Sequence, residues 1–307
     1  CLNKNPADKD KYTLLHSAAE HGQLNILEYL LPLVKDKNPK DSKAMTPLKL
    51  ATQKEDLPTI ELFAPHVNSV DCLDTLFFLC KKGHLDTLKC FLQECLNKNP
   101  GDKDKYTLMH CAAEHGKLNI IEYLVPLLDD KNPKAGPRKY AKCRITKDQV
   151  TPLHLAAWAE HLPVIEFLVP HLNGDINPAY GDGFTVLHDA AYFGHLNVVA
   201  YYTGILDNPN PGQISNDAFR GRTPLHYAAQ EGHLEVVKHF CNLLKDKNPS
   251  DDNGYTPLHI AAAYGHLNVV AYYTGKLDNP TPRHIPNDQF RGRTPLHYAA
   301  QEGHLEV

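Results

Sequence analysis

A single pattern recurs along the chain and constrains its fold more than any other feature of the sequence. It begins with Thr-Pro-Leu-His, continues with two small residues and ends in Gly-His-Leu. Nine copies have their first residue, here called the leading residue, at Thr13, Thr46, Asp74, Thr107, Thr151, Thr185, Thr223, Thr256 and Thr294. The commonest spacing between consecutive leading residues is 33 residues. A fixed period of this length predicts a solenoid, in which each repeat buries its apolar face against its neighbours.

Each part of the pattern has a structural reason. The leading Thr can accept a hydrogen bond from an N–H at a helix start, and the proline after it suits the first helical position. Paired small residues such as Ala228-Ala229 let a neighbouring helix approach closely. Glycine nine residues after the leading residue favours a left-handed helix end, and the spacing of Leu234, Val237 and Cys241 predicts a second helix. We expect an Asn-Pro pair to stop that helix.

The pattern resembles the ankyrin repeat, whose unit carries a motif close to T-P-L-H-x-A-A-x-x-G-H. The resemblance covers essentially the whole chain and is clearest from Thr223 to Leu234 (TPLHYAAQEGHL) and from Thr256 to Leu267 (TPLHIAAAYGHL). It implies an all-α fold, an ankyrin-repeat solenoid of about nine helix-turn-helix units with β-hairpin fingers. We expect a single ankyrin repeat array over residues 1–307, truncated at both ends.

Three repeats, numbered here by their leading residues, depart from the pattern. Repeat 2 has Glu55 and repeat 5 has Glu160 at the glycine position, and repeat 3 has Leu79 and Cys80 in place of the small pair. Repeat 2 spans 28 residues instead of 33, so its outer helix or its exit turn must be abbreviated. The opening segment CLNKNPADKDKYTLLH recurs as CLNKNPGDKDKYTLMH from Cys95, which indicates tandem duplication.

Extra residues enter the turn between repeats. The spacing from the Asn-Pro proline to the next leading Thr is seven residues in five repeats, but eighteen before repeat 5 and fourteen before repeats 7 and 9. Such insertions map to one face of a repeat array, often the binding face. The longest insertion runs from Lys134 to Val150 and is strongly basic. Two interpretations stay open, namely that Arg138 and Arg144 contact an acidic or phosphorylated peptide, or that the insertion is a solvated loop.

Aromatic residues gather at positions that carry recognition in ankyrin proteins. In that family the two residues before the glycine close the first helix and face a groove. Here these positions include the only tryptophan of the chain, and the adjoining finger adds two aromatic residues. Since an exposed aromatic cluster is typical of a binding surface, we predict partner contacts at Trp158, Tyr180, Phe184, Tyr192, Phe193 and Tyr264. The alternative is that Trp158 packs against the long finger of its own repeat.

Composition excludes several classes of partner. The net charge of −4 and the pI of about 6.6 lack the basic excess typical of nucleic-acid binding. No apolar run approaches the roughly 18 residues that span a bilayer, so we expect no membrane insertion by this chain. The eight cysteines have no regular spacing, and each Asn-x-Ser/Thr sequence has proline at x. We therefore predict an intracellular, cytoplasmic protein.

No chemistry-bearing motif emerges from the residues. Twelve of the nineteen histidines recur at two fixed positions of the pattern, which favours a structural role for them. The cysteines around repeat 3 lack a CxxC pair, and the sequence has no phosphate-binding loop, HExxH or Gly-x-Ser-x-Gly. We predict no enzyme activity, no catalytic residue, no cofactor and no metal site.

Three functional hypotheses stay open. The first is a non-catalytic module that binds a partner protein or peptide through its groove and fingers. The second is a targeting or regulatory array of a larger enzyme, kinase or ion channel whose working domain lies outside this chain. The third is a mechanical spacer, in which case the groove residues could be replaced by alanine without loss of a partner. The sequence identifies neither the partner nor the oligomeric state.

Overall fold

The structure is a computed structural model of the chain. It describes residues 5–67, 72–93, 97–139, 146–172, 175–180, 183–205, 221–276 and 292–307. Contacts divide the chain into two compact units, Cys1–Lys131 and Asn132–Val307. The all-α repeat fold is confirmed, because the described residues form seventeen α-helices, two for each of repeats 1–8 and one for repeat 9.

The first unit contains repeats 1–4. Its first, or inner, helices begin at or next to a leading residue, and its second, or outer, helices follow within a few residues. Their bounds are α1 (Leu14–Glu20), α2 (Leu24–Leu30), η1 (Leu31–Leu33), α3 (Pro47–Gln53), α4 (Leu57–Phe63), η2 (Ala64–His66), α5 (Leu73–Lys82), α6 (Leu85–Leu92), α7 (Leu108–Glu114), α8 (Leu118–Leu124) and η4 (Val125–Leu127), where η marks a 3₁₀ turn.

The second unit contains repeats 5–9 and two short β-hairpins. In one hairpin Arg138 pairs with Lys147, and in the other Tyr180 pairs with Phe184, which confirms the predicted fingers at these two places. The elements are β1 (Arg138–Lys139), β2 (Thr146–Lys147), α9 (Pro152–Trp158), α10 (Leu162–Leu168), η5 (Val169–His171), β3 (Ala179–Tyr180), β4 (Phe184–Thr185), α11 (Val186–Phe193), α12 (Leu196–Ile205), α13 (Pro224–Gln230), α14 (Leu234–Leu243), α15 (Pro257–Ala263), α16 (Leu267–Lys276) and α17 (Pro295–Glu302).

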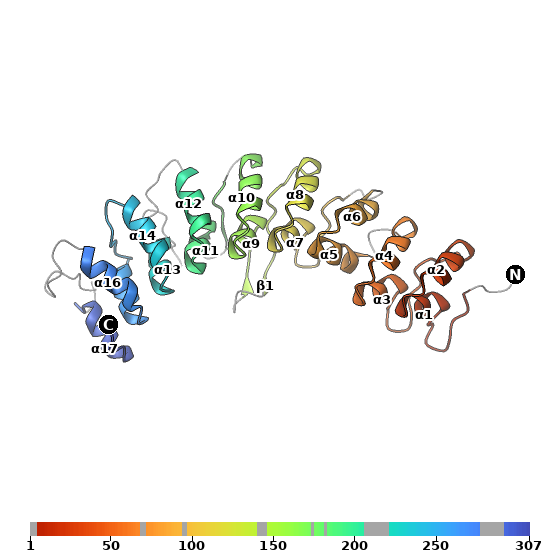
Figure 1. Cartoon of the computed structure of the whole chain (residues 1–307), viewed down its shortest axis with the longest axis horizontal. Helices are drawn as coiled ribbons and strands as arrows, with labels where there is room; N and C mark the ends of the chain where they lie inside the picture. The colour runs from red at the N-terminus through yellow and green to blue at the C-terminus, as the bar shows by residue number, and fades with distance from the viewer. Residues whose placement is uncertain are drawn as a thin grey trace. The chain divides into compact units, whose positions relative to one another are not determined.

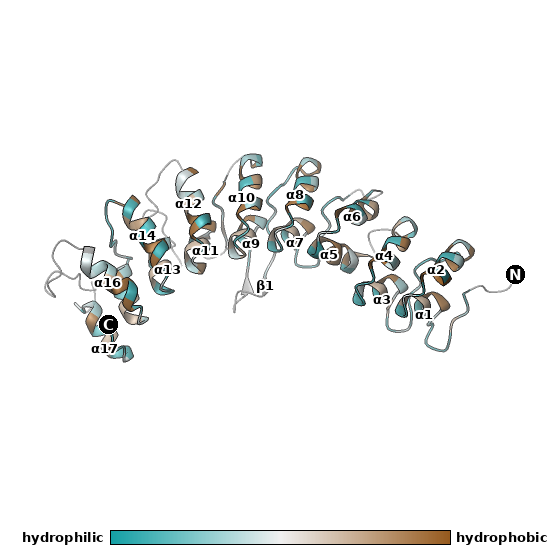
Figure 2. Ribbon diagram, viewed as in Figure 1, coloured by the Kyte–Doolittle hydropathy of each residue, from teal (hydrophilic) through white to brown (hydrophobic). Residues whose placement is uncertain are grey.

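Inner helices stack on inner helices within each unit. In the second unit α9, α11, α13, α15 and α17 pack in this order, and α12, α14 and α16 form the outer row (Figure 1). The helices present both hydrophobic and hydrophilic residues (Figure 2). The small pairs lie where inner helices meet, and Ala112, Ala113, Ala228 and Ala229 are fully buried. Small side chains therefore permit the close helix approach expected from the pattern.

The glycine position adopts the left-handed conformation in every described repeat. The predicted glycines have φ between 63° and 87°, and Glu55 and Glu160 take the same conformation at 56° and 62°. Repeats 2 and 5 thus have the same helix end as the other repeats, although a residue with a side chain is strained at positive φ.

In repeats 1, 4, 5 and 7 the outer helix and its final turn end before the Asn-Pro pair, contrary to expectation. In repeats 1, 2, 4 and 5 a proline inside the final turn converts it into a 3₁₀ turn, as at Pro32 in η1. The asparagine instead caps the following repeat. Its side-chain oxygen accepts the backbone N–H of the second residue of the next inner helix, as in Asn38 to Leu48 at 3.1 Å and Asn248 to Leu258 at 3.1 Å.

The shortening of repeat 2 lies in its exit turn. Its outer helix α4 has seven residues, as α2, α8 and α10 have, but α5 begins at Leu73, soon after η2. Asp74 does not precede the helix as the other leading residues do, because it lies inside the first turn of α5. There it forms an ion pair with Lys49 at 3.0 Å.

Candidate partner-binding surface

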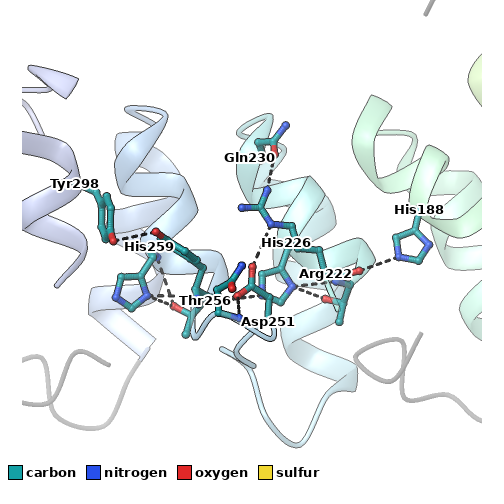
Figure 3. A network of polar contacts seen from close by, with 11 residues as sticks. His188, Arg222, His226, Gln230, Asp251, Thr256, His259 and Tyr298 are labelled. Carbon is teal, nitrogen blue, oxygen red and sulfur yellow. Dashed lines mark hydrogen bonds and ion pairs between the residues drawn. The ribbon is translucent and has the colours of Figure 1, made fainter. Parts of the chain in front are cut away.

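In repeats 1, 6, 7 and 8 the histidine of Thr-Pro-Leu-His joins its repeat to the next. The backbone N–H of the leading Thr donates to histidine Nδ1, for example at 3.1 Å between Thr223 and His226. The opposite ring nitrogen, Nε2, donates to a carbonyl of the following finger, as in His226 to Tyr255 at 3.0 Å. His188 likewise donates to the Arg222 carbonyl at 3.2 Å (Figure 3). A neutral imidazole satisfies both hydrogen bonds, because its Nδ1 accepts and its Nε2 donates.

The histidine of Gly-His-Leu forms a second ladder in the second unit. Each Nε2 forms a hydrogen bond with a backbone carbonyl of the preceding repeat, at one of the two residues before the glycine position. The pairs are His195 to Trp158 at 3.2 Å, His233 to Tyr192 at 3.0 Å, His266 to Gln230 at 2.7 Å and His304 to Ala263 at 3.0 Å. These periodic histidines are therefore structural links.

Burial favours the neutral form of His226, a member of the first ladder. The ring of His226 is fully buried, and desolvation lowers its pKa to about 3.

Within the described residues no group of three or more His, Cys, Asp or Glu side chains is arranged to hold a metal ion.

The two residues before the glycine form a row along each unit, which we call the inner-helix ends. A brace fixes the first of the two in four repeats. The side chain just before the leading Thr bonds to the side chain eight residues later, and the braces are Tyr12 to Glu20, Tyr106 to Glu114, Arg222 to Gln230 and Arg293 to Gln301. A braced side chain loses less conformational freedom when it binds a partner.

The brace of repeat 7 belongs to a longer polar network. Asp251, whose carboxylate is fully buried, accepts a hydrogen bond from Arg222 Nε at 3.2 Å. Arg222 Nη1 then donates to Gln230 at 3.2 Å, and the Gln230 amide donates to Glu231 at 2.9 Å. Figure 3 shows Arg222 between Gln230 and Asp251. The finger of repeat 8 therefore helps to orient the acidic inner-helix end of repeat 7.

The predicted exposed aromatic cluster is wrong for three of its members. The exposed fractions are only 2% for Trp158, 3% for Tyr180 and 7% for Phe184, so a partner cannot reach these side chains. Tyr180 meets Trp158 edge-on at 6.2 Å, stacks on Phe184 at 5.8 Å and donates to Asp189 at 2.9 Å. Trp158 thus packs against Tyr180 in the finger of the following repeat.

Three of the predicted aromatic residues do reach the surface. Tyr192 and Phe193 are half-buried at the end of α11, with ring centroids 5.1 Å apart in an edge-on arrangement. Phe193 also stacks on His195 at 6.0 Å. Tyr264, the second inner-helix end residue of repeat 8, is 54% exposed.

The basic finger is described only in part. Arg138 belongs to β1, whereas Arg144 lies outside the described residues. Of the two Phe-Arg-Gly-Arg segments, the described arginines are engaged within the protein: Arg222 with Asp251, and Arg293 with Gln301 and above the Tyr298 ring at 5.8 Å. A role for Arg138 and Arg144 in contacting an acidic peptide stays a prediction.

Sequence reasoning missed the braces, although the sequence contains a signal for them. Where tyrosine precedes the leading Thr in repeats 1 and 4, glutamate follows eight residues later, and where arginine precedes it in repeats 7 and 9, glutamine follows. This co-occurrence is the mark of a side-chain contact within one repeat.

Known families match along most of the chain. A family model for ankyrin repeats in three copies matches residues 1–74, 65–135, 136–202 and 203–274, and a single ankyrin repeat model matches residues 291–307. The chain belongs to the ankyrin repeat family. A Fowlpox virus (strain NVSL) protein, FPV223, that is named for its ankyrin repeats is 34% identical over 120 residues, which are 37% of this chain and 82% of the viral protein.

Ankyrin repeats are generally protein–protein interaction modules and generally non-catalytic. None of the helices in the described part of this ankyrin repeat chain has both the length and the apolar character of a bilayer-crossing segment.

Proposed function

We propose that the inner-helix ends of repeats 6–8 bind a partner protein, with Tyr192, Phe193 and Tyr264 as its anchors. The observation that carries this proposal is the exposure of aromatic side chains at these ends, above all the 54% exposure of Tyr264. Aromatic side chains dominate interface energetics because they bury a large area and lose little conformational freedom.

The chemistry of this surface indicates the kind of partner. Glu231 in repeat 7 lies between the aromatic ends of repeats 6 and 8 along the stack. The Gln230 amide donates to Glu231, and Arg222 holds Gln230 in turn. We expect a segment with two apolar anchors and a basic residue between them. Stacked helices lie about 10 Å apart, so the anchors are separated by about 20 Å, or about six residues of extended chain.

The proposed activity is binding without catalysis, in an intracellular setting. Eight periodic histidines bond to a neighbouring repeat, which gives these side chains a structural role. Cys72, Cys80, Cys111 and Cys241 form no disulfide and are buried in the described core, as is typical of proteins kept in a reducing compartment. The continuity of repeats 1–9 as one array belongs to the same proposal.

Affinity capture from cell extract tests the binding surface. The variant carries Tyr192→Gln and Phe193→Glu, which copy the Gln230-Glu231 pair of repeat 7, together with Tyr264→Glu. Because the chain itself tolerates these residues at equivalent positions, we expect the variant to fold. The matched control is Tyr29→Gln, which removes a tyrosine with 71% exposure from the outer helix α2.

We expect a partner to be captured by the unaltered chain and by the Tyr29→Gln control but lost from the triple variant. Unaltered capture by the triple variant would place the partner elsewhere, on the basic finger or on the first unit. A basic peptide with two apolar residues about six positions apart, found in the captured protein, would support the partner chemistry.

A further inference from the structure

Two cysteine side chains meet across the junction between repeats 3 and 4. Cys80 lies in α5 and Cys111 in α7, two inner helices that pack against each other. Each thiol also reaches the other helix, since Cys80 Sγ lies 3.4 Å from the Leu108 carbonyl oxygen and Cys111 Sγ 3.7 Å from that of Phe77. Leu108 precedes Cys111 by three residues and Phe77 precedes Cys80 by three. The two thiols therefore face each other at the same level.

His115 completes this cluster one turn after Cys111. Its Nδ1 lies 4.0 Å from Cys111 Sγ and 3.0 Å from the Cys111 carbonyl oxygen. The hydrogen bond from Cys80 lowers the pKa of Cys111 to about 6, and His115 acts in the same direction against burial. The contact with Cys111 raises the pKa of Cys80 and that of His115. These opposite shifts favour Cys111 as the thiolate of the pair and Cys80 as the thiol.

We propose that Cys80 and Cys111 are a peroxide-reactive pair that closes to a disulfide between repeats 3 and 4. The Cys111 thiolate attacks one oxygen of a hydroperoxide, the O–O bond breaks, and a sulfenic acid forms while hydroxide or alkoxide leaves. The Cys80 sulfur then attacks the sulfenic sulfur, and the displaced hydroxyl leaves as water with the Cys80 proton. Two thiols lose two electrons in total, and the peroxide gains them.

Burial determines which oxidant fits this pair. Cys80 has no exposed surface and Cys111 keeps 4%, while the half-buried His115 lies beside it at an inner-helix end. Hydrogen peroxide is small enough to reach such a thiolate, whereas a bulky disulfide is not. The same burial keeps the resolving Cys80 thiol away from other reagents until the sulfenic acid has formed.

The chain supplies conservative variants for both cysteines. Seven repeats have alanine at the position of Cys80, so Cys80→Ala restores the usual small residue. Repeat 1, which nearly duplicates repeat 4, has Ser17 at the position of Cys111, so Cys111→Ser copies a natural alternative. Both variants are expected to fold.

Hydrogen peroxide treatment of the full chain at pH 7, followed by peptide mapping, tests the proposal. We expect one peptide that links Cys80 to Cys111. Cys80→Ala should leave a sulfenic acid at Cys111 that dimedone captures, and Cys111→Ser should leave Cys80 as a thiol. His115→Gln should slow the loss of the Cys111 thiol roughly twofold at pH 7, since a rise of one unit from a pKa of about 6 lowers the thiolate fraction from about nine-tenths to about one-half.

Cys241 provides an internal control, because it is also buried and burial raises its pKa. We expect Cys241 to stay reduced while Cys111 reacts. The proposal is overturned if Cys111 reacts no faster than Cys241, or if Cys111 advances to the sulfinic acid while Cys80 stays free.

Discussion

The glycine at the end of an inner helix satisfies two constraints in the second unit. It takes a left-handed conformation, with φ of 78° at Gly194, and it lies under the histidine of the next repeat. A Cβ added at Gly194 would lie 2.5 Å from His233 Nδ1, closer than van der Waals contact permits. At Gly194 the second histidine ladder therefore favours glycine for its space as well as for its backbone.

Gly194→Ala is expected to lower the free energy of unfolding by about 2–4 kcal/mol, because left-handed strain adds to overpacking against His233. The matched control is Gly303→Ala, which has φ of 81° but nothing within 4 Å of the added Cβ. We expect it to cost at most about 1 kcal/mol. Urea unfolding of both variants measures the difference, and equal losses would show that steric contact with the histidine ladder contributes nothing.

His226 is expected to make the second unit sensitive to acid. Burial lowers its folded pKa to about 3, against an ordinary value of 6.5. Between these values the unfolded chain binds a proton and the folded chain does not, so the free energy of unfolding falls as the pH decreases from about 6.5 to 3. At pH 5 the loss from this one side chain is about 2 kcal/mol.

His226→Gln keeps an N–H donor for the Tyr255 carbonyl but does not titrate. We expect the variant to be less stable at pH 7 yet to lose less stability than the unaltered chain between pH 7 and pH 5, as measured by urea unfolding. Parallel pH profiles for the two proteins would exclude His226 as a source of acid sensitivity.

At the scale of single elements, the two glutamates at the glycine position have a strained backbone. Glu55 and Glu160 have φ of 56° and 62°, where glycine is favoured. Glu55→Gly and Glu160→Gly should each raise the free energy of unfolding by about 0.5–1 kcal/mol. Glu55 also pairs with Lys82 at 2.7 Å, but such an exposed pair is worth little.

Glu55→Ala and Glu160→Ala separate backbone strain from the loss of the side chain. Both retain a Cβ at positive φ, so thermal unfolding should show no stabilisation for alanine and a higher midpoint for glycine. Stabilisation by alanine equal to that by glycine would assign the effect to the carboxylate.

Local signals made the helix pairs predictable, because each start and each left-handed end depends on residues within one repeat. Thr223 and Gly232 are examples, and both lie where the pattern placed them. Finger packing was not predictable in this way. Trp158 is buried by Tyr180, which belongs to the next repeat, and a sequence pattern within repeat 5 holds no information on that contact.

The asparagine of the Asn-Pro pair shows the same limit. Its sequence context indicates a break after a helix, yet Asn38 bonds to Leu48 of the following helix. The prediction placed this residue correctly between repeats but assigned its role to the wrong helix. The braces, in contrast, involve pairs within one repeat and could have been found by comparing the nine copies.

At the scale of the whole molecule, the stability of each repeat depends on its neighbours. Repeats 1 and 4 are nearly identical in sequence, but Ile26 in repeat 1 is 48% exposed while the equivalent Ile120 in repeat 4 is fully buried. We predict that repeats 1 and 9 and the junction of repeats 2 and 3 open before the rest.

Hydrogen exchange measures this difference with an internal comparison. The backbone amide of Leu27 in repeat 1 should exchange at least roughly tenfold faster than that of Ile121, its counterpart in repeat 4, since about 1.4 kcal/mol of neighbour packing suffices for that ratio. Equal protection of the two amides, or uniform protection along each unit, would contradict nearest-neighbour stabilisation.

The central claim is that the inner-helix ends of the second unit are the partner-binding surface. Site-specific photo-crosslinking tests it most directly, with a benzophenone amino acid in place of Tyr264 at an inner-helix end or of Tyr29 on an outer helix. Both side chains are exposed, so the two probes differ in location and not in access. We predict that the captured partner crosslinks to position 264 and not to position 29. Crosslinking at position 29 alone would contradict the claim.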